Sequence, residues 1–121
     1  MTFPTIQFKA TNTELDATLT DLVDQKFTSL EKYVGTETDA FCEVEFEKET
    51  AHQSGKYFRV EANFTLKGNL YRAEATEDSF EKAIDEVRSE LDKELRRASG
   101  KRETMIKKGG RELKDMMRSG S

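Results

Sequence analysis

The sequence predicts one α+β domain of two layers, in which a four-stranded mixed sheet carries two helices on one face. Three observations lead to this fold class. The 121 residues suit a single domain with one core. Four short segments alternate apolar and polar residues, which is typical of strands covered on one face. Two longer segments repeat apolar residues at spacings of three and four, which is typical of amphipathic helices. The resulting element order is β-α-β-β-β-α.

The first strand and the first helix are predicted in the opening third of the chain. Residues 5–10 alternate apolar and polar side chains and predict a short, half-buried strand. The polar residues 11–13 offer turn and N-cap groups. Residues 14–34 then predict a helix of about six turns, and Gly35 is placed to end it.

Three further strands follow. Residues 42–47 and 57–66 each present one apolar and one polar face, and the polar segment 50–55 connects them. Residues 67–69 predict a tight hairpin turn into a last strand at 70–75. We expect the first two strands to be parallel neighbours joined by a right-handed crossover, and the later strands to be antiparallel.

The second helix is expected to begin after Thr76 or Asp78, either of which could cap it. Its apolar face runs from Phe80 to Leu95, and residues 98–100 predict a break. We therefore divide the chain into an α+β domain at 1–100 and a basic, amphipathic C-terminal tail at 101–121, either helical or disordered.

The charge is distributed unevenly along the chain. The net charge of −4 divides into −8 for residues 1–100, with 13 Lys and Arg against 21 Asp and Glu, and +4 for residues 101–121, with seven against three. A basic C-terminal end on an acidic body indicates a polyanionic partner. Cations at a helix C-terminus also complement the helix dipole, but that accounts for only two or three of them.

A row of cations is predicted on the second helix. Lys93, Arg97 and Lys101 recur every four residues, Arg96 lies beside them, and Arg88 is further back. Such a row can follow a phosphate backbone. RNA is favoured over DNA because no recognition helix for base readout is evident, and folded RNA is recognised largely by shape and phosphate contacts.

Catalysis, metals, cofactors and membranes find little support. Cys42 and His52 are the single cysteine and the single histidine. Cys42 lies on an apolar strand face and His52 in a polar connector, so we do not expect them to form a nucleophilic pair. No zinc ligand set, phosphate loop, membrane span or signal peptide is present in the sequence. We expect a non-enzyme without cofactor, metal or small-molecule substrate, located in the cytoplasm.

Three short motifs carry a resemblance to a known family. They are Leu-Glu-Lys-Tyr at 30–33, Leu-Tyr-Arg-Ala-Glu at 70–74, and Glu-Asp-Ser-Phe-Glu-Lys-Ala-Ile-Asp at 77–85. In this order they resemble the ribosome hibernation-promoting factor and ribosome-associated inhibitor A family, also called sigma-54 modulation proteins, over residues 5–102. This chain is similar to the short form, without the C-terminal dimerisation domain of longer members.

The resemblance implies a ribosome hibernation factor. Such a protein binds the small ribosomal subunit in the channel for messenger RNA and transfer RNA, and inhibits translation in resting or stressed cells. The partner implied is ribosomal RNA, with no DNA or membrane, and the free protein is expected to be a monomer. The resemblance places RNA-contacting cations at Lys26, Lys32, Lys93, Arg97 and Lys101. To these we add the neighbouring helix cations Arg88 and Arg96, and the C-terminal cations Arg102, Lys107, Lys108 and Arg111.

The first helix departs from the family pattern. Thr20 and Ser29 stand where cations are common, and Asp21 and Asp24 add negative charge. Glu90 is likewise acidic where a lysine is frequent. We therefore expect the tail to supply the cations that the first helix lacks.

Two alternatives remain open at the level of sequence. The fold class is also similar to double-stranded-RNA-binding domains, so a generic RNA-binding module is one alternative; the acidic start of the second helix, at 77–81, weakens it. The other is a protein- or membrane-interaction module that uses the basic amphipathic tail.

Overall fold

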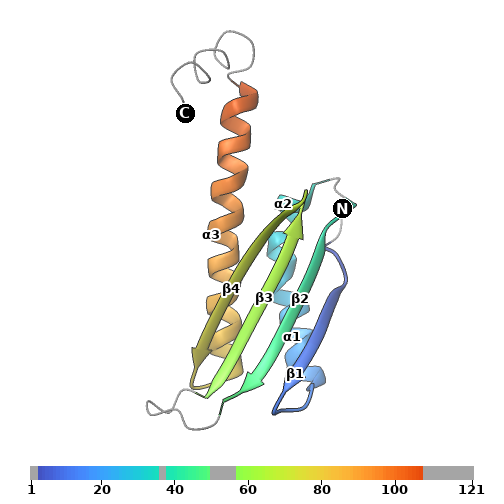
Figure 1. Ribbon diagram of the computed structural model, residues 1–121, viewed down its shortest axis with the longest axis vertical. Coiled ribbons are helices and arrows are strands. Elements are labelled where there is room, and N and C mark those ends of the chain that lie inside the picture. The colour runs from blue at the N-terminus through green and yellow to red at the C-terminus, as the bar shows by residue number, and fades with distance from the viewer. Residues whose placement is uncertain (1–2, 36–37, 50–56, 108–121) are drawn as a thin grey trace.

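Helices cover one face of a four-stranded sheet, and the opposite face is open (Figure 1). The computed structural model describes residues 3–35, 38–49 and 57–107, with side chains up to residue 100. The elements are β1 (Ile6–Thr11), α1 (Ala17–Phe27), the 3₁₀ turn η1 (Thr28–Leu30), α2 (Glu31–Val34), β2 (Phe41–Lys48), β3 (Phe58–Leu66), β4 (Asn69–Glu77) and α3 (Phe80–Lys107). The predicted fold class and element order are confirmed.

The strands lie in the sheet in chain order, β1-β2-β3-β4. β1 and β2 are parallel, with Ile6 opposite Cys42, and the other two pairings are antiparallel, as predicted. The turn between β3 and β4 has Lys67 and Gly68 at φ 54° and 80°. Positive φ at both central residues is the geometry of a two-residue hairpin turn whose twist matches that of the strands.

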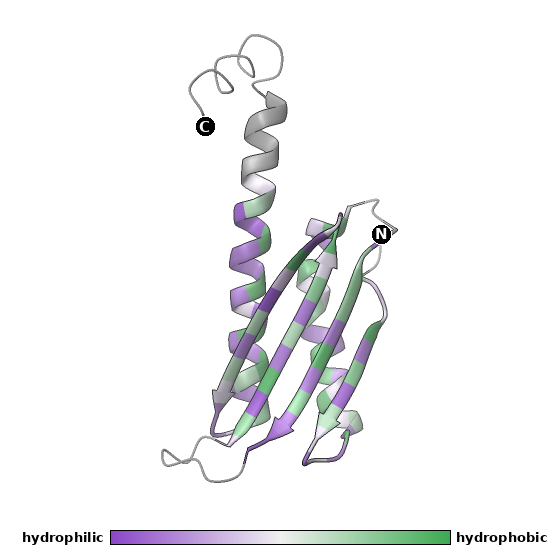
Figure 2. Ribbon diagram, viewed as in Figure 1, coloured by the Kyte–Doolittle hydropathy of each residue, from purple (hydrophilic) through white to green (hydrophobic). Residues whose placement is uncertain are grey.

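The core lies between the sheet and the helices. Figure 2 shows hydrophilic and hydrophobic residues alternating along each strand, so that every second side chain faces the helices. Phe27, Phe46 and Phe64 are among the largest fully buried side chains. α3 contributes the other half of the core through a stripe of six buried residues: Phe80, Ala83, Ile84, Val87, Leu91 and Leu95.

The first predicted helix is shorter than expected and is interrupted. α1 begins at Ala17, where the Asp16 carboxylate accepts a hydrogen bond from the Thr18 N–H at 2.8 Å, so the cap predicted at residues 11–13 is wrong. Near its end, the hydroxyls of Thr28 and Ser29 donate to backbone carbonyls one turn back. Such bonds compete with regular helix geometry, and the chain tightens into η1 before continuing as α2.

α3 differs from the prediction at both ends. β4 extends to Glu77, and the Ser79 hydroxyl caps the helix by accepting from the Lys82 N–H at 3.2 Å, so Thr76 and Asp78 are not the caps. The break predicted at 98–100 is also wrong, because the helix continues to Lys107. One glycine costs a helix only about 1 kcal/mol relative to alanine, which good helix formers on both sides can offset. The division into residues 1–100 and 101–121 stays a prediction, since 108–121 lie outside the described residues.

Candidate nucleic-acid interface

The two halves of α3 differ in charge and in surroundings. Residues 80–92 carry two cations and five carboxylates, a net of −3, whereas residues 93–107 carry six cations and two carboxylates, a net of +4. The acidic half packs on the sheet, and Leu95 is the last buried side chain described on the helix. Beyond it, α3 projects past the end of the sheet (Figure 1). We call residues 93–107 the basic half of α3.

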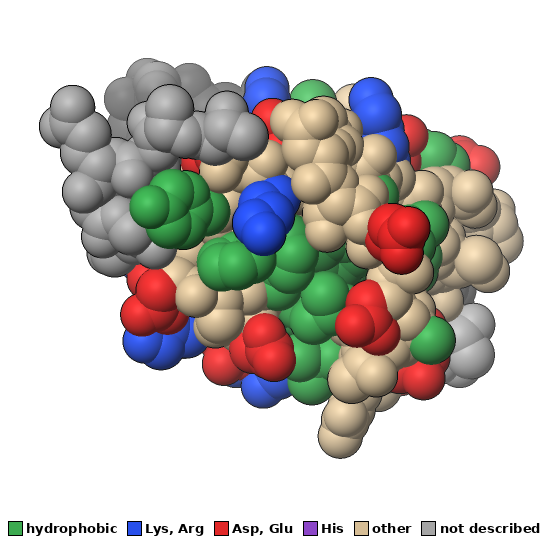
Figure 3. All heavy atoms as spheres, turned by 90° about the horizontal axis from the view of Figure 1, so that it is seen from below, with side chains coloured by type: hydrophobic (Ala, Val, Ile, Leu, Met, Phe, Trp, Pro, Cys, Tyr) green, Lys and Arg blue, Asp and Glu red, His purple; other side chains and the backbone are tan. Residues whose placement is uncertain are grey.

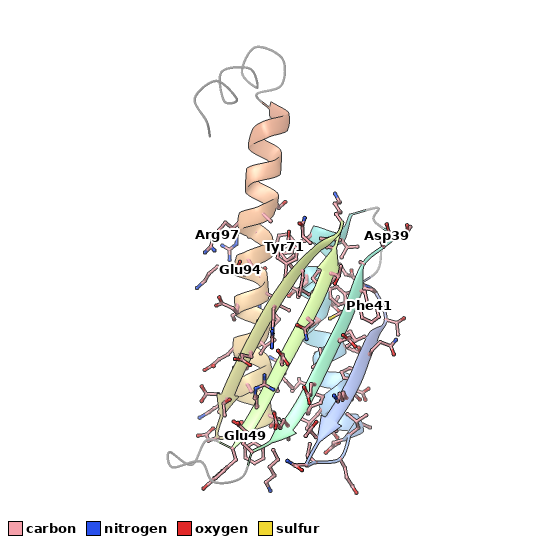
Figure 4. All side chains as sticks on the ribbon, viewed as in Figure 1. Asp39, Phe41, Glu49, Tyr71, Glu94 and Arg97 are labelled. Carbon is pink, nitrogen blue, oxygen red and sulfur yellow. The ribbon has the colours of Figure 1, made fainter. Side chains whose placement is uncertain are left out.

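The described cations of the basic half are exposed and paired with carboxylates on the same helix. The side chains of Lys93, Arg96 and Arg97 are 61, 70 and 58% exposed. They lie 3.8, 2.7 and 3.3 Å from Glu90, Asp92 and Glu94, respectively. Exposed ion pairs of this kind contribute about 0–1 kcal/mol, so a phosphate group can replace the carboxylate at little cost. Figure 4 shows Arg97 and Glu94 together on the side of α3 that points away from the strands.

The predicted row of cations divides between two sides of α3. Lys93 and Arg97 are one turn apart and therefore neighbours on the helix surface. Arg96 instead donates to Asp92, which also accepts a hydrogen bond from the Tyr33 hydroxyl of α2 at 2.9 Å. Arg96 thus lies on the side of α3 that faces α2.

Around Asp92 the structure forms a polar cluster that we call the α2–α3 junction: Lys32, Tyr33, Asp92 and Arg96. The Lys32 Nζ lies 5.3 Å from the centre of the Tyr33 ring. Burial and the hydrogen bond to Asp92 raise the pKa of Tyr33. Burial acts to raise the pKa of Asp92 as well, but the hydrogen bonds from Tyr33 and Arg96 and the nearby charges outweigh it and lower that pKa. Two predicted RNA contacts from distant parts of the sequence, Lys32 and Arg96, meet here.

A second pair of predicted cations meets between α1 and α3. A shallow groove is lined by Leu22, Gln25, Lys26, Ser29 and Arg88. The Lys26 ammonium pairs with Asp85 of α3 at 2.6 Å, which holds the lysine at the rim of this groove. Lys26 and Arg88 therefore lie close to one another, although 62 residues separate them in the chain.

The remaining predicted contacts are less fully described. Lys101, Arg102 and Lys107 lie on the helical backbone of α3, and only their backbone is described. Lys108 and Arg111 lie outside the described residues, as does His52. Their role in binding stays a prediction.

The opposite end of the molecule has a different surface. Figure 3 shows that end, where apolar side chains gather at the centre and carboxylates lie around them. Leu15 and Tyr57 are among the large apolar residues that the structure exposes. The cations of α3 are thus concentrated away from this end.

Sequence reasoning missed Tyr33 and Asp92 as residues that position a cation. Tyr33 belongs to one of the family-like motifs, and Asp92 precedes Arg96 by one helical turn, a spacing that favours an ion pair. Only the folded chain brings Tyr33 to Asp92, because they are 59 positions apart in the sequence.

The described residues offer little for catalysis or metal binding. Cys42 is fully buried, and burial together with Glu43 raises the pKa of its thiol to about 12. The thiolate that a nucleophilic cysteine needs is therefore scarce at neutral pH. Within the described ranges no group of His, Cys, Asp and Glu could hold a metal ion, and none of the helices described there is long and apolar enough to cross a membrane.

A two-layer α+β domain with a projecting basic helix has the features of a binding protein for a polyanion. The family follows from comparison: the sequence model of the sigma 54 modulation protein / S30EA ribosomal protein family matches residues 6–103. The chain belongs to this family, which confirms the resemblance found in the sequence and gives the protein a ribosome-associated role.

Solved structures agree with this assignment. The N-terminal domain of protein Y from Thermus thermophilus is 25% identical, with a TM-score of 0.63, over 80% of this chain and 98% of that one. A ribosomal subunit interface protein from Coxiella burnetii has a TM-score of 0.62 at 20% identity, over 78% of this chain and 97% of that one, which shows the shared fold. Comparison with curated protein sequences gives no match.

Proposed function

We propose that this protein binds the small ribosomal subunit in the channel for messenger RNA and transfer RNA, and so inhibits translation in resting or stressed cells. Membership of the sigma 54 modulation protein / S30EA ribosomal protein family supports the ribosome as the partner. In this proposal, ribosomal RNA is the polyanion that the cations contact. The protein acts in the cytoplasm and is a monomer before it binds. It needs no cofactor or metal, and it binds neither DNA nor a membrane.

One observation carries the proposal: the cations of α3 are concentrated in the half that lies beyond the last buried residue. A helix of 15 residues is about 22 Å long, enough to pass several phosphates of an RNA strand. Because the sheet does not cover this part of α3 (Figure 1), RNA can approach it from more than one side. A narrow channel with walls of RNA is a site that suits such a helix.

The cations near the other helices extend this contact surface. The α2–α3 junction presents Lys32 and Arg96, and the groove between α1 and α3 presents Lys26 and Arg88. Arginine can donate two parallel hydrogen bonds to one phosphate, whereas lysine acts as a point charge. Asp21 and Asp24 are exposed on α1, so we place the stronger contact on α3.

Co-sedimentation with purified small subunits across a salt series tests this proposal. Each lost phosphate contact reduces the slope of log affinity against log salt by about 0.7–0.9. The double variant Lys93→Glu/Arg97→Glu should therefore bind more weakly and with a slope reduced by about 1.4–1.8. Lys48→Glu/Lys67→Glu makes the same charge change at two exposed positions outside α3, the end of β2 and the turn between β3 and β4, and should leave the slope as it is.

Two results would contradict the proposal. An unchanged slope for Lys93→Glu/Arg97→Glu would remove α3 from the contact surface. Equal affinity for an isolated RNA duplex and for intact subunits would indicate a generic RNA-binding module instead. Inhibition of translation is tested separately, by adding the chain to a cell-free translation reaction in amounts equal to the ribosomes.

A further inference from the structure

The open face of the sheet carries an exposed apolar pair at the end from which α3 projects. Phe41 of β2 is 44% exposed and Leu70 of β4 is 62% exposed. Both are register partners of Thr65 on β3, so the three residues form one row across the sheet. Figure 4 shows Phe41 near that end of β2. Two large apolar side chains that flank Thr65 on an uncovered face indicate an interaction surface.

On the open face, the residues of β2 that follow Phe41 are acidic. Glu43, Glu45 and Glu47 follow Phe41 at every second position and therefore lie on the same face. The open face also carries Glu61 and Glu74, against the three cations Lys9, Arg59 and Arg72, for a net charge of −2.

The two arginines of this face are already bound to carboxylates. Arg59 contacts Glu47, Glu61 and Glu74, and Arg72 contacts Glu61. Glu43 is exposed and makes no ion pair within the described part of the chain. Glu45 accepts a hydrogen bond from the Thr11 hydroxyl at 2.6 Å and lies opposite Lys9 in the register. The carboxylates next to the apolar pair are therefore those with the least internal compensation.

We infer that the open face binds an extended basic segment of a protein that neighbours the RNA-bound chain. Phe41, Glu43 and Glu45 are spaced by about 6.6 Å each along β2. An extended segment with an apolar residue, followed by two cations at alternate positions, has the same spacing. Its apolar side chain can contact Phe41, and its cations can pair with Glu43 and Glu45. The inference goes beyond the proposed function, because it adds a protein partner to the RNA.

Charge decides between this occupant and others. RNA would meet a surface of its own sign, and the same holds for the open face of a second copy of this chain. A protein that shares a surface with RNA is itself rich in Lys and Arg, because it neutralises phosphates. The open face has the complementary sign. Phe41 and Leu70 are the first residue of β2 and the second of β4, and both strands begin at the end of the sheet from which α3 projects (Figure 1).

The first experiment uses a defined peptide and is independent of the ribosome. A fluorescent peptide containing Leu-Thr-Arg-Thr-Arg is titrated with the full chain, and its anisotropy is recorded at low salt. We expect saturable binding that weakens at least about fivefold for Glu43→Gln/Glu45→Gln and for Phe41→Ser. A peptide with Ser in place of Leu should bind more weakly as well. Asp21→Asn/Asp24→Asn removes the same charge from α1 and should leave the affinity unchanged.

The second experiment compares intact small subunits with their ribosomal RNA freed of protein. Glu43→Gln/Glu45→Gln should weaken binding to subunits several-fold without weakening binding to the free RNA. Lys93→Glu/Arg97→Glu should weaken both.

Three results would overturn the inference: no peptide binding by the unaltered chain, equal peptide binding by Glu43→Gln/Glu45→Gln, or equal subunit binding by that variant. A chain that binds the peptide but not the subunits would contradict the proposed function, and would leave this surface as a binding site for basic segments. All the substituted side chains are exposed or half-buried, and circular dichroism verifies that each variant is folded.

Discussion

The two halves of α3 differ in burial and in charge, which separates a contribution to folding from the proposed binding along one helix. In the half at 80–92, apolar residues at helical spacing are buried against the sheet, and carboxylates outnumber cations. In the half at 93–107, cations outnumber carboxylates, and burial ends at Leu95. The difference implies that substitutions in the first half change the free energy of unfolding, whereas substitutions in the second half change binding.

The largest expected effect is on stability, from Leu91→Ala in the first half. Leu91 is fully buried, and truncating a buried leucine costs about 2–5 kcal/mol. Urea denaturation measures the loss. Arg97→Ala in the second half is the control and should change the free energy of unfolding by no more than about 0.5 kcal/mol. Equal effects of the two substitutions would contradict the comparison.

The second prediction concerns binding and uses a chain truncated after Ala98. The truncation removes seven cations and three carboxylates but none of the described buried residues. We expect affinity for small subunits to fall by at least about tenfold, or 1.4 kcal/mol, at constant salt. Stability should change little. A truncated chain that binds as tightly as the full chain would show that the tail does not compensate for the acidic first helix.

Tyr33→Phe tests the α2–α3 junction, which holds α2 against α3. The substitution removes the hydrogen bond from the Tyr33 hydroxyl to Asp92, and we expect a loss of about 0.5–1.5 kcal/mol in the free energy of unfolding. Tyr71→Phe is a matched control, because no hydrogen bond of the Tyr71 hydroxyl is found among the described residues. Identical stabilities of the two variants would remove the stabilising role of the junction.

The smallest effect is a pH dependence from Asp92. Its pKa is lowered in the folded protein, below the value of about 3.9 for an unfolded aspartate. The stabilisation by its carboxylate is therefore fully present above about pH 5 and is lost as the pH falls through the folded pKa. The stability difference between the unaltered chain and Asp92→Asn should be constant from pH 5 to 8 and should shrink below about pH 4. A difference that grew on acidification would contradict this assignment.

The strands could be predicted from sequence because alternation of side chains is a local property. β3 agrees with its predicted range to within one residue, and the parallel pairing of β1 and β2 follows from the crossover rule. The helix ends could not be predicted as well. Asp16 and Ser79 act as caps in place of equally suitable neighbours, and Gly100 does not end α3.

The sequence supplies the residues of the candidate site, whose role in binding stays a prediction, but not their arrangement. The cations follow from charge counting, helical spacing and the family resemblance, whereas their neighbours depend on tertiary contacts. The sequence contains no local signal that Tyr33 meets Asp92 or that Lys26 meets Asp85. Arg96 lies on a different side of α3 from Lys93 and Arg97, and only the contact of Tyr33 with Asp92 shows this.

The continuity of α3 through Gly100 has a consequence for the entropy of binding. A flexible tail that became ordered on RNA would lose about 1–2 kcal/mol of backbone entropy per residue. Up to Lys107 the chain is already helical, and the direction of the helix is set by Leu91 and Leu95 in the core. That part of the proposed contact surface is thus preorganised, so more of the electrostatic attraction would remain available as affinity.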